Sequence, residues 1–565
     1  MYRMMKLVSA GTIRATGLLL LRCCFLVLLL LSVSWHLNLS IVPYVLPLAY
    51  FISAVPLLVQ RRFQAICLSL FSMTFFVVLS MLIWDYSADG QWYHMPAAWA
   101  LAHGWNPIVQ HHNNMISELV NANLWIDHYS KGLETLAASV ISVTGNTESG
   151  KAVNGFFLLI TFSLVYEVLF SFWNLSGRKG CFYAFILSFS PIVCTELFTF
   201  YIDFASYDCV VWLLCLLMLF DRRPSRGLLV YVFMTVYIGC SIKTNLTFWM
   251  GFVVVLYSLY SFVRRRCCHA WSVSIAALLS VVLMVFTIGF NPLMTNVQDH
   301  HNPLYPFGDS RCDPTEAVIQ GAQPKYLVGK PRVEQVLIGM TARPEGGFLT
   351  PYSAPWRITK RNITHAGSMT CNVGGGGLFF VDVLLLSLVL ALACNPAKHL
   401  KWYLMFEFML ILSLFILPYG SCFRYVPFFF LFPIVVLLYS EKYGLRFEKA
   451  IWLRRVICLL LAIDACVALG IAFGYGLKNT YVVNTYVRRV KAAGGVENVR
   501  TTNWSFLNKV SDSSVLDSCI LQNMSPNKNY ILMPYQRNGD VWIDSNRVNM
   551  DLNVRNYWLK KIVEL

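Results

Sequence analysis

Long apolar runs alternate with short polar breaks along most of the chain, up to about residue 475. Many of these runs reach about 17 residues or more, the length that an α-helix needs to cross the hydrocarbon core of a membrane. The pattern predicts thirteen membrane-spanning helices. Their expected ranges are 23–40, 42–60, 64–84, 151–173, 181–200, 205–220, 227–243, 245–263, 271–290, 378–394, 403–418, 426–440 and 453–475.

Three longer polar stretches interrupt or follow these runs. The stretches 85–150 and 291–377 are expected to be large loops on one side of the membrane, and residues 479–565 a polar tail. Apolar residues at helical spacing near 93–108 and 125–145 predict amphipathic helices that lie along the membrane surface in the first loop. The predicted organisation is a transmembrane domain over 1–478 and a small α/β domain outside the membrane over 479–565.

Composition agrees with an integral membrane protein. Of the 565 residues, 57% are hydrophobic and 13% are charged, whereas soluble domains carry about 25% charged residues. The fold class expected from the sequence is therefore an all-α polytopic membrane protein. The N-terminus is basic and then apolar without a small-residue cleavage site, which predicts an uncleaved first span.

The net charge of +16 would indicate nucleic-acid binding in a soluble protein. Here the basic residues form short clusters between apolar runs, which is typical of topology signals on the cytoplasmic side, so no nucleic acid is expected. Thirteen spans with a cytoplasmic N-terminus place every cluster on one side. The clusters are Arg3, Lys6, Arg14 and Arg22; Arg61 and Arg62; Arg178 and Lys179; Arg222, Arg223 and Arg226; Arg264 to Arg266; Lys398 and Lys401; and Lys442, Arg446 and Lys449.

Two carboxylates stand directly after the third expected span, at Asp85 and Asp89. Acids at a helix end can be ordinary interfacial residues. Tyr93 and His94 follow them closely, and the same loop carries His128 and Lys131 further on. Because these aromatic and ionisable residues lie in the same loop as Asp85 and Asp89, a functional site is favoured over simple interfacial anchoring of the two carboxylates.

Polar groups also occur at the other ends expected on that side of the membrane. Asp203 lies between the fifth and sixth spans, Lys243 between the seventh and eighth, and His300 near the start of the second large loop. Arg424 and Tyr425 lie between the eleventh and twelfth spans. Lys243 and Arg424 could simply snorkel, and His300 could hydrogen-bond within its loop. Since both cations oppose the positive-inside trend, a charged cavity for a phosphate-bearing amphiphile is favoured.

Cysteines and histidines show no ligand spacing typical of a metal site. Cys312 and Cys371 share the second large loop, where a disulfide between them would be feasible in an oxidising compartment. No phosphate-binding glycine motif is present in the sequence. We therefore expect no required cofactor and no metal.

Several motifs, taken in order, resemble the GT-C superfamily of integral-membrane glycosyltransferases. They are "DGQWYHMP", "HYSKGLETLAASVISVTG", "YID", "SIKTNLTF", "NPLYPFG" and "RYVP". The resemblance covers about residues 64–440 and is strongest to bacterial members related to protein mannosyltransferases and aminoarabinose transferases. It implies transfer of a sugar from a polyprenyl-phosphate carrier to an acceptor hydroxyl outside the cytoplasm.

The resemblance also implies a base at the start of the first large loop. Asp89 stands four residues before "YH", the spacing associated with that base, and Asp85 is the rival. Many members carry Asp-Glu here, whereas this chain has "DYSAD", so the assignment of the base stays open between Asp85 and Asp89.

A divalent metal occurs in oligosaccharyltransferases of this broad superfamily. This chain has no Asp-x-Asp at this point, so no metal is indicated.

Sugar transfer from a lipid phosphate to a hydroxyl requires the same kinds of groups, a carboxylate and cations. An acceptor hydroxyl is a poor nucleophile, so a carboxylate should take its proton as it attacks the anomeric carbon. The leaving lipid phosphate needs cations, which Lys243 and Arg424 can supply, and one base with cations predicts inversion. Asp203 could orient sugar hydroxyls, and Tyr93, or alternatively Trp92 or Trp105, could stack on the sugar ring. The remaining substrate-binding candidates are His94, His128, Lys131, His300 and Tyr425.

Two other functions stay open from the sequence. A transporter or flippase of a lipid-linked sugar would also need a charged amphipathic cavity, although the chain has no evident inverted repeat. An O-antigen polymerase or ligase shares many spans and a large outer loop. The expected location is a bacterial inner membrane with the site and the C-terminal domain in the periplasm, and an endoplasmic-reticulum membrane has the same topology. The acceptor, be it a glycolipid, an envelope glycan or a protein, and the sugar are not specified by any motif.

Overall fold

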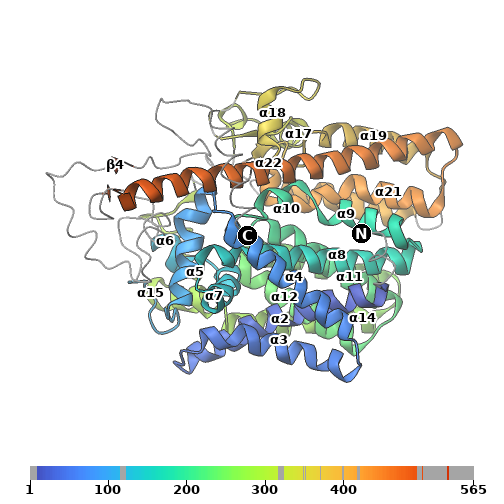
Figure 1. The fold of residues 1–565 in the computed structure, drawn as a ribbon. Coiled ribbons are helices and arrows are strands. Elements are labelled where there is room, and N and C mark those ends of the chain that lie inside the picture. The colour runs from blue at the N-terminus through green and yellow to red at the C-terminus, as the bar shows by residue number, and fades with distance from the viewer. Residues whose placement is uncertain are drawn as a thin grey trace.

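The structure is a computed structural model that describes residues 9–114, 123–315, 323–347, 349, 351–368, 371–396, 400–416, 420–492, 499–500 and 531–532. Helices dominate these residues (Figure 1). A helix satisfies all of its internal backbone hydrogen bonds within one segment, which is why long apolar sequences adopt it in lipid. The chain is thus an all-α membrane protein.

Eight helices among the described residues are long and apolar enough to cross a membrane. Each falls on one of the expected spans. They are α2 (Ala10–His36), α3 (Val42–Val59), α4 (Phe63–Leu82), α8 (Ala152–Trp173), α11 (Phe204–Arg222), α13 (Thr244–Val263), α14 (Cys267–Phe286) and α22 (Ile451–Ala492).

Five further helices overlap the remaining expected spans, and they have between 12 and 17 residues. At that length they fall short of the usual spanning requirement. They are α9 (Gly177–Ser188), α12 (Arg226–Ile242), α19 (Phe380–Ala393), α20 (Leu400–Ile416) and α21 (Leu431–Tyr443).

Short elements occupy the connections. The helices are α5 (Met95–Ala102), α6 (Asn123–His128), α7 (Gly132–Thr144), α10 (Pro191–Glu196), α15 (Thr295–His300), α17 (Arg332–Thr341) and α18 (Lys360–His365). The short 3₁₀- or π-helical turns are η1 (Gly90–His94), η3 (Thr147–Lys151), η4 (Phe290–Met294), η5 (Lys325–Leu327), η6 (Phe423–Tyr425), η7 (Pro427–Phe430) and η8 (Glu448–Ala450). Strand β1 (Glu345–Gly346) pairs antiparallel with β2 (Cys371–Val373), and β3 (Val499–Arg500) pairs parallel with β4 (Ile531–Leu532).

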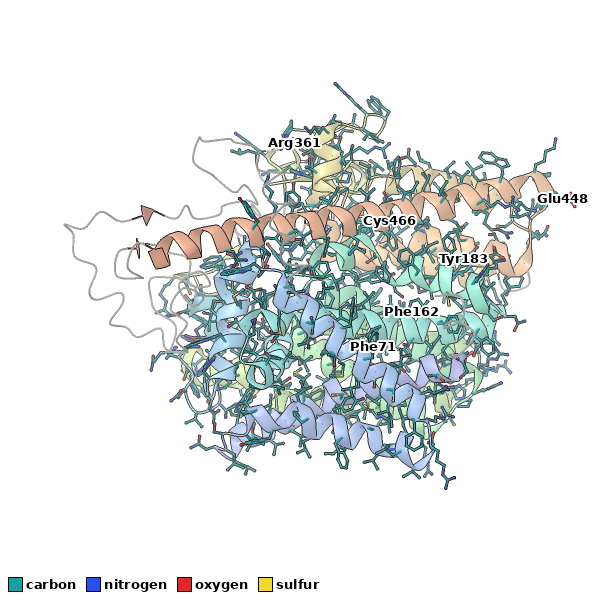
Figure 2. All side chains as sticks on the ribbon, viewed as in Figure 1. Phe71, Phe162, Tyr183, Arg361, Glu448 and Cys466 are labelled. Atoms are coloured by element: carbon teal, nitrogen blue, oxygen red, sulfur yellow. The ribbon has the colours of Figure 1, made fainter. Side chains whose placement is uncertain are left out.

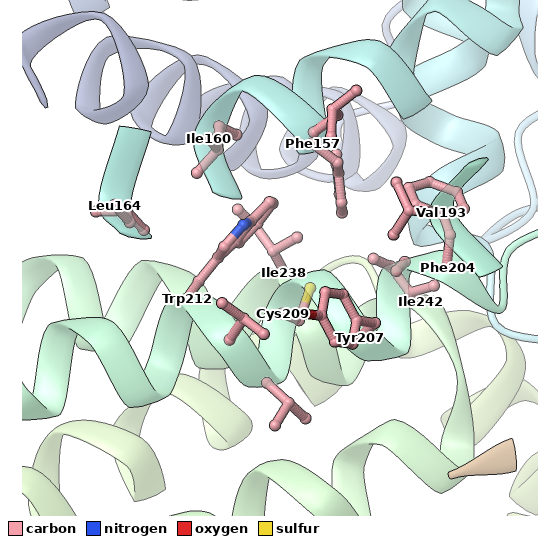
Figure 3. Packing of buried hydrophobic residues seen from close by; sticks show 14 of the residues in the cluster. Phe157, Ile160, Leu164, Val193, Phe204, Tyr207, Cys209, Trp212, Ile238 and Ile242 are labelled. Atoms are coloured by element: carbon pink, nitrogen blue, oxygen red, sulfur yellow. The ribbon is translucent and has the colours of Figure 1, made fainter. Parts of the chain in front are cut away.

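The long helices pack side by side around a core that α8 and α11 share (Figures 1 and 3). Phe157 of α8 packs on Trp212 of α11 with ring centroids 4.6 Å apart. The indole Nε1 of Trp212 donates to the hydroxyl of Thr161 at 2.6 Å, which satisfies a buried donor. The outer helices present apolar side chains outward, as Phe71 of α4 does at 70% exposure (Figure 2). Such a surface suits lipid contact.

Two ion pairs show that several inter-helix connections meet at one end of the bundle, which we name the basic end. Arg266, between α13 and α14, donates to Asp221 near the end of α11 at 2.6 Å. Lys179, at the start of α9, donates to Glu441 near the end of α21 at 2.7 Å. The opposite end, where α4 ends and α11 begins, is named the site end.

The first expected span, 23–40, began too late. Helix α2 starts at Ala10, where the Ser9 hydroxyl accepts the N–H of Thr12 at 3.1 Å. The basic residues near the N-terminus suggested a boundary, but Arg14 lies inside the helix and pairs with Glu167 of α8 at 3.3 Å.

The expected surface helix near 93–108 is not amphipathic in the structure. Residues 95–101 of α5 are all buried, because α7 packs against it. An interfacial helix keeps one face in water, and this helix has no such face over those residues. The apolar spacing was read correctly as a helix, but the elements that cover its second face come from other parts of the chain.

The expected boundary at 478 falls inside α22, which continues to Ala492. Beyond that helix, nearly all of the predicted domain over 479–565 lies outside the residues that the structure describes.

Cys312 and Cys371, the expected disulfide partners, are both free thiols. Cys371 is buried, and its thiol donates to the carbonyl of Val373 at 2.9 Å.

Candidate functional site

Asp89 and Arg424 meet at the site end although 335 residues separate them. Asp89 directly precedes η1, and its side chain is 27% exposed. Arg424 lies in η6, in the connection between α20 and α21. Its Nη2 donates to Asp89 Oδ2 at 2.8 Å. The pair combines an accessible carboxylate with a cation that still reaches the surface.

Asp203 joins the same group from the turn before α11. One carboxylate oxygen pairs with Arg424 Nε, and the other pairs with the ammonium of Lys243, which lies between α12 and α13. Asp203 is only 1% exposed. Burial raises the pKa of the Asp203 carboxyl, but Arg424 and Lys243 outweigh burial and hold it at about 2. We name Asp89, Asp203, Lys243 and Arg424 the four-charge cluster.

Aromatic rings support the two cations. The Arg424 guanidinium lies over the ring of Tyr201, 4.5 Å from its centroid. The Lys243 ammonium lies 5.1 Å from the ring centroid of Tyr425. Such contacts stabilise a cation by about 0.5–2 kcal/mol and leave its donors free for an anion. Tyr93 stacks on Trp125 at 5.8 Å, and it is half-buried on η1, four residues after Asp89.

A small cavity adjoins Arg424. Among the described residues its wall comes from α10, Pro344, residues 365–368 and 371–377, and η6. Gly374 has φ +67°, and a Cβ there would lie 2.4 Å from the carbonyl oxygen of Ala342. At Gly375 a Cβ would lie 2.9 Å from the Cβ of Phe423, directly before Arg424. The glycine run therefore lets the chain approach closely beside the cation.

Asp85, the rival of Asp89, is buried and fully engaged. Its Oδ1 accepts the N–H of Ser87 at 2.8 Å, and its Oδ2 accepts the Ser87 hydroxyl at 2.9 Å. Oδ2 also accepts the N–H of Phe200 at 3.4 Å. Burial raises the pKa of Asp85 to about 7, and Lys151 opposes that rise. A carboxylate that is 1% exposed and packed in this way has a structural role.

Three other expected site residues have structural partners instead. His94 is buried and pairs through Nδ1 with Glu134 of α7. Lys131 is buried and donates to the carbonyls of Asp127 and Tyr129, each at 2.9 Å. Asp203 has both of its oxygens paired with cations, and its expected contact with sugar hydroxyls stays a prediction. Trp105, a stacking candidate, is 1% exposed and cannot cover a sugar ring.

His128 and His300 lie together but apart from these contacts. Their ring centroids are 5.1 Å apart; His300 stacks on Tyr305, and His128 meets the same ring edge to face. His128 Nδ1 also bonds to Asn296 at 2.7 Å. Burial lowers the pKa of His128 to about 4, so its imidazole is neutral at pH 7. Of the eleven candidates, Asp89, Asp203, Lys243 and Arg424 form the four-charge cluster, and Tyr425 and Tyr93 lie beside it.

Sequence reasoning missed a buried ion pair beside Asp85. Lys151 and Glu148, in η3, pair with their side chains fully buried. Glu148 Oε2 also accepts the backbone N–H of Asp85 at 2.9 Å, and Lys151 donates to the carbonyl of Ile83. Lys151 stands at the end of an expected span on the same side of the membrane as Lys243. That position drew attention to Lys243 in the sequence, and it could have drawn attention to Lys151 as well. The pair fixes the chain just before Asp89.

Replacing Lys151 with methionine is expected to lower the free energy of unfolding by about 3–5 kcal/mol. The substitution leaves Glu148 charged and buried without its cation. The measurement is the unfolding midpoint of the purified chain in detergent. Lys179→Met is the matched control, because its pair with Glu441 has a lysine that is 55% exposed and should be worth at most about 1 kcal/mol. Equal midpoints for the two variants would contradict a stabilising role of the buried pair.

The chain has no significant match to a protein-family model, to a curated protein sequence or to a solved structure.

Proposed function

We propose that the chain is an inverting membrane glycosyltransferase that moves a sugar from a polyprenyl-phosphate carrier to an acceptor hydroxyl. The observation that carries the proposal is the pairing of Asp89, an accessible carboxylate, with Arg424, a cation that borders a cavity. A base and an anion-binding group next to each other are what displacement of a phosphate by a hydroxyl requires.

Asp89 is proposed as the general base. Its carboxylate takes the proton of the acceptor hydroxyl while the hydroxyl oxygen forms a bond to the anomeric carbon. The bond between that carbon and the phosphate oxygen breaks on the opposite face, and the lipid phosphate leaves with the electron pair. A single displacement inverts the anomeric configuration and needs one carboxylate rather than the pair that a retaining glycosidase uses.

Arg424 and Lys243 are proposed to bind the carrier phosphate. Support comes from the tyrosine rings beneath both cations and from Asp203, which is buried and holds them in place. The Arg424 side chain is 18% exposed, and a planar guanidinium matches phosphate geometry in a bidentate way. No further cation or cofactor is required in this scheme.

Arg424 also links binding to catalysis in the proposed scheme. Its Nη2 donates to Asp89 Oδ2 at 2.8 Å. An incoming phosphate competes for that donor, because a phosphate oxygen accepts charge-assisted hydrogen bonds as strongly as a carboxylate does. Once Nη2 turns to the phosphate, Asp89 becomes free to accept the hydroxyl proton. The base is thereby released only when the donor substrate is bound.

The proposal places the site end on the extracytoplasmic side of a bacterial inner membrane. Its support is the positive-inside trend, because arginines and lysines gather where Arg266 and Lys179 form their ion pairs. Thirteen passes, made of the eight long helices and the five shorter ones, would put the N-terminus in the cytoplasm. The predicted C-terminal domain would then lie in the periplasm.

The test compares transfer with transport. The purified full-length chain is reconstituted into liposomes that contain a radiolabelled polyprenyl-phosphate-sugar mixture and is given cell-envelope acceptors. We expect label to move from the carrier to acceptors only in the presence of the protein. Label that crosses the bilayer while it stays on its carrier would contradict the transferase and support a transporter.

A further inference from the structure

Three side chains with metal-binding atoms come together at the site end, outside the four-charge cluster. His112, Asp127 and His128 each offer one ligand atom, and these atoms all lie within 4.8 Å of one another. His112 follows α5, whereas Asp127 and His128 end α6. Imidazole and carboxylate are the ligands that zinc and neighbouring divalent metals take in proteins.

The hydrogen bonds around His128 fix which of its nitrogens can bind a metal. The Asn296 amide nitrogen donates to the carbonyls of Tyr305 at 3.1 Å and of Pro303 at 3.4 Å. Its oxygen therefore faces His128 Nδ1, at 2.7 Å, and that nitrogen must carry the proton. Nε2 is left with its lone pair, and such an orienting acceptor is typical of histidines that bind metals.

Asp127 has one oxygen committed and one turned toward the group. Oδ1 accepts the backbone N–H of Asn113 at 2.9 Å. Oδ2 lies 3.3 Å from Nδ1 of His112. The carboxylate is 5% exposed, so its position is set by the surrounding chain, whereas His112 is 65% exposed and can rotate. The group combines two fixed ligands with one adjustable ligand.

We propose that His112, Asp127 and His128 form a zinc site that fastens the two large loops together. In a tetrahedral site the ligand atoms lie roughly 3.3 Å apart, a distance that rotation of the exposed His112 can approach. The second loop takes part through Asn296 of α15, which orients His128. A neighbouring contact joins the same loops, because His111 pairs with Asp299 at 2.7 Å. The metal would hold this layer of the site end in place.

The experiment measures zinc binding by the purified full-length chain, which must carry no histidine tag. Metal-free protein is titrated with Zn²⁺, and Co²⁺ replaces it for absorption spectra that report tetrahedral ligation. We expect one Zn²⁺ per chain, a raised unfolding midpoint and a tetrahedral Co²⁺ spectrum. His112→Ala should weaken Zn²⁺ binding by more than about 10-fold, since loss of second-shell partners alone commonly has an effect of this size.

Two further variants keep the test decisive. Asp127→Asn should also weaken Zn²⁺ binding and remove the Co²⁺ spectrum. His103→Ala, at an exposed histidine in the same loop, should bind Zn²⁺ as the wild type does. No stoichiometric zinc, or equal affinities for the wild type and His112→Ala, would overturn the proposal. Neither readout depends on sugar transfer, so the zinc site and the transferase are tested separately.

Discussion

Replacing Arg424 with alanine is expected to abolish carrier binding and to lower the free energy of unfolding by about 3–5 kcal/mol. The loss of stability follows because Asp203, which is 1% exposed, would keep only Lys243 as its cation. The loss of binding follows because Arg424 is the cation that borders the cavity. Binding of a radiolabelled polyprenyl phosphate and the unfolding midpoint in detergent measure the two effects.

A second variant separates charge from shape. Arg424→Lys keeps a cation but loses the planar fork that can bind Asp203 and the phosphate together. Hydrogen bonds to charged groups are worth about 1.5–3 kcal/mol, so we expect about 10- to 100-fold weaker carrier binding. The matched control is Arg343→Ala, which breaks a comparable pair with Asp382 at 2.6 Å. That control should lose stability and keep carrier binding. Normal carrier binding by Arg424→Ala would contradict the assigned phosphate site.

Replacing Asp89 with asparagine is expected to lower turnover by about 100- to 10,000-fold, the contribution of a positioned general base. Asparagine keeps the shape and can still accept the Arg424 hydrogen bond, but it cannot take a proton from the acceptor. Asp382→Asn is the control, because Asp382 is a partly exposed aspartate in a comparable arginine pair. It should keep full turnover. Equal turnover for Asp89→Asn and Asp382→Asn would show that Asp89 is not the base.

The membrane architecture was the part that the sequence predicted best. Apolar runs determine where helices form, because lipid leaves no alternative for the backbone. Their alternation also explains why Asp203, Lys243 and Arg424 could be expected to meet. Each stands at the same end of a helix pair, so packing the helices side by side brings them together.

The choice between Asp85 and Asp89 could not be made from the sequence. The two residues are four apart and share the same local pattern. Their exposures differ because Ser87 and Phe200 enclose Asp85, and Phe200 comes from a distant part of the chain. The same limit explains His94 and Lys131, whose partners are set by how α5, α6 and α7 pack. A polar side chain in a loop can be assigned to a functional site only when its hydrogen-bonding partners in the folded chain are known.

The group of His112, Asp127 and His128 was missed for a related reason. Sequence reasoning searched for ligands at short, regular spacing, and His112 stands fifteen residues before Asp127. The two segments meet only through the folding of the first large loop. Asn296, which sets the orientation of His128, belongs to the second loop and carries no signal of that role in the sequence.

The measurement that tests the central claim most directly is a single turnover with the carrier already bound. Wild-type protein and Asp89→Asn are each loaded with the same radiolabelled polyprenyl-phosphate sugar until binding is saturated. Acceptor is then added, and the label transferred in the first turnover is counted. We predict full transfer by the wild type and almost none by Asp89→Asn at equal occupancy. Equal transfer by both proteins would contradict the assignment of Asp89 and of the four-charge cluster as the active site.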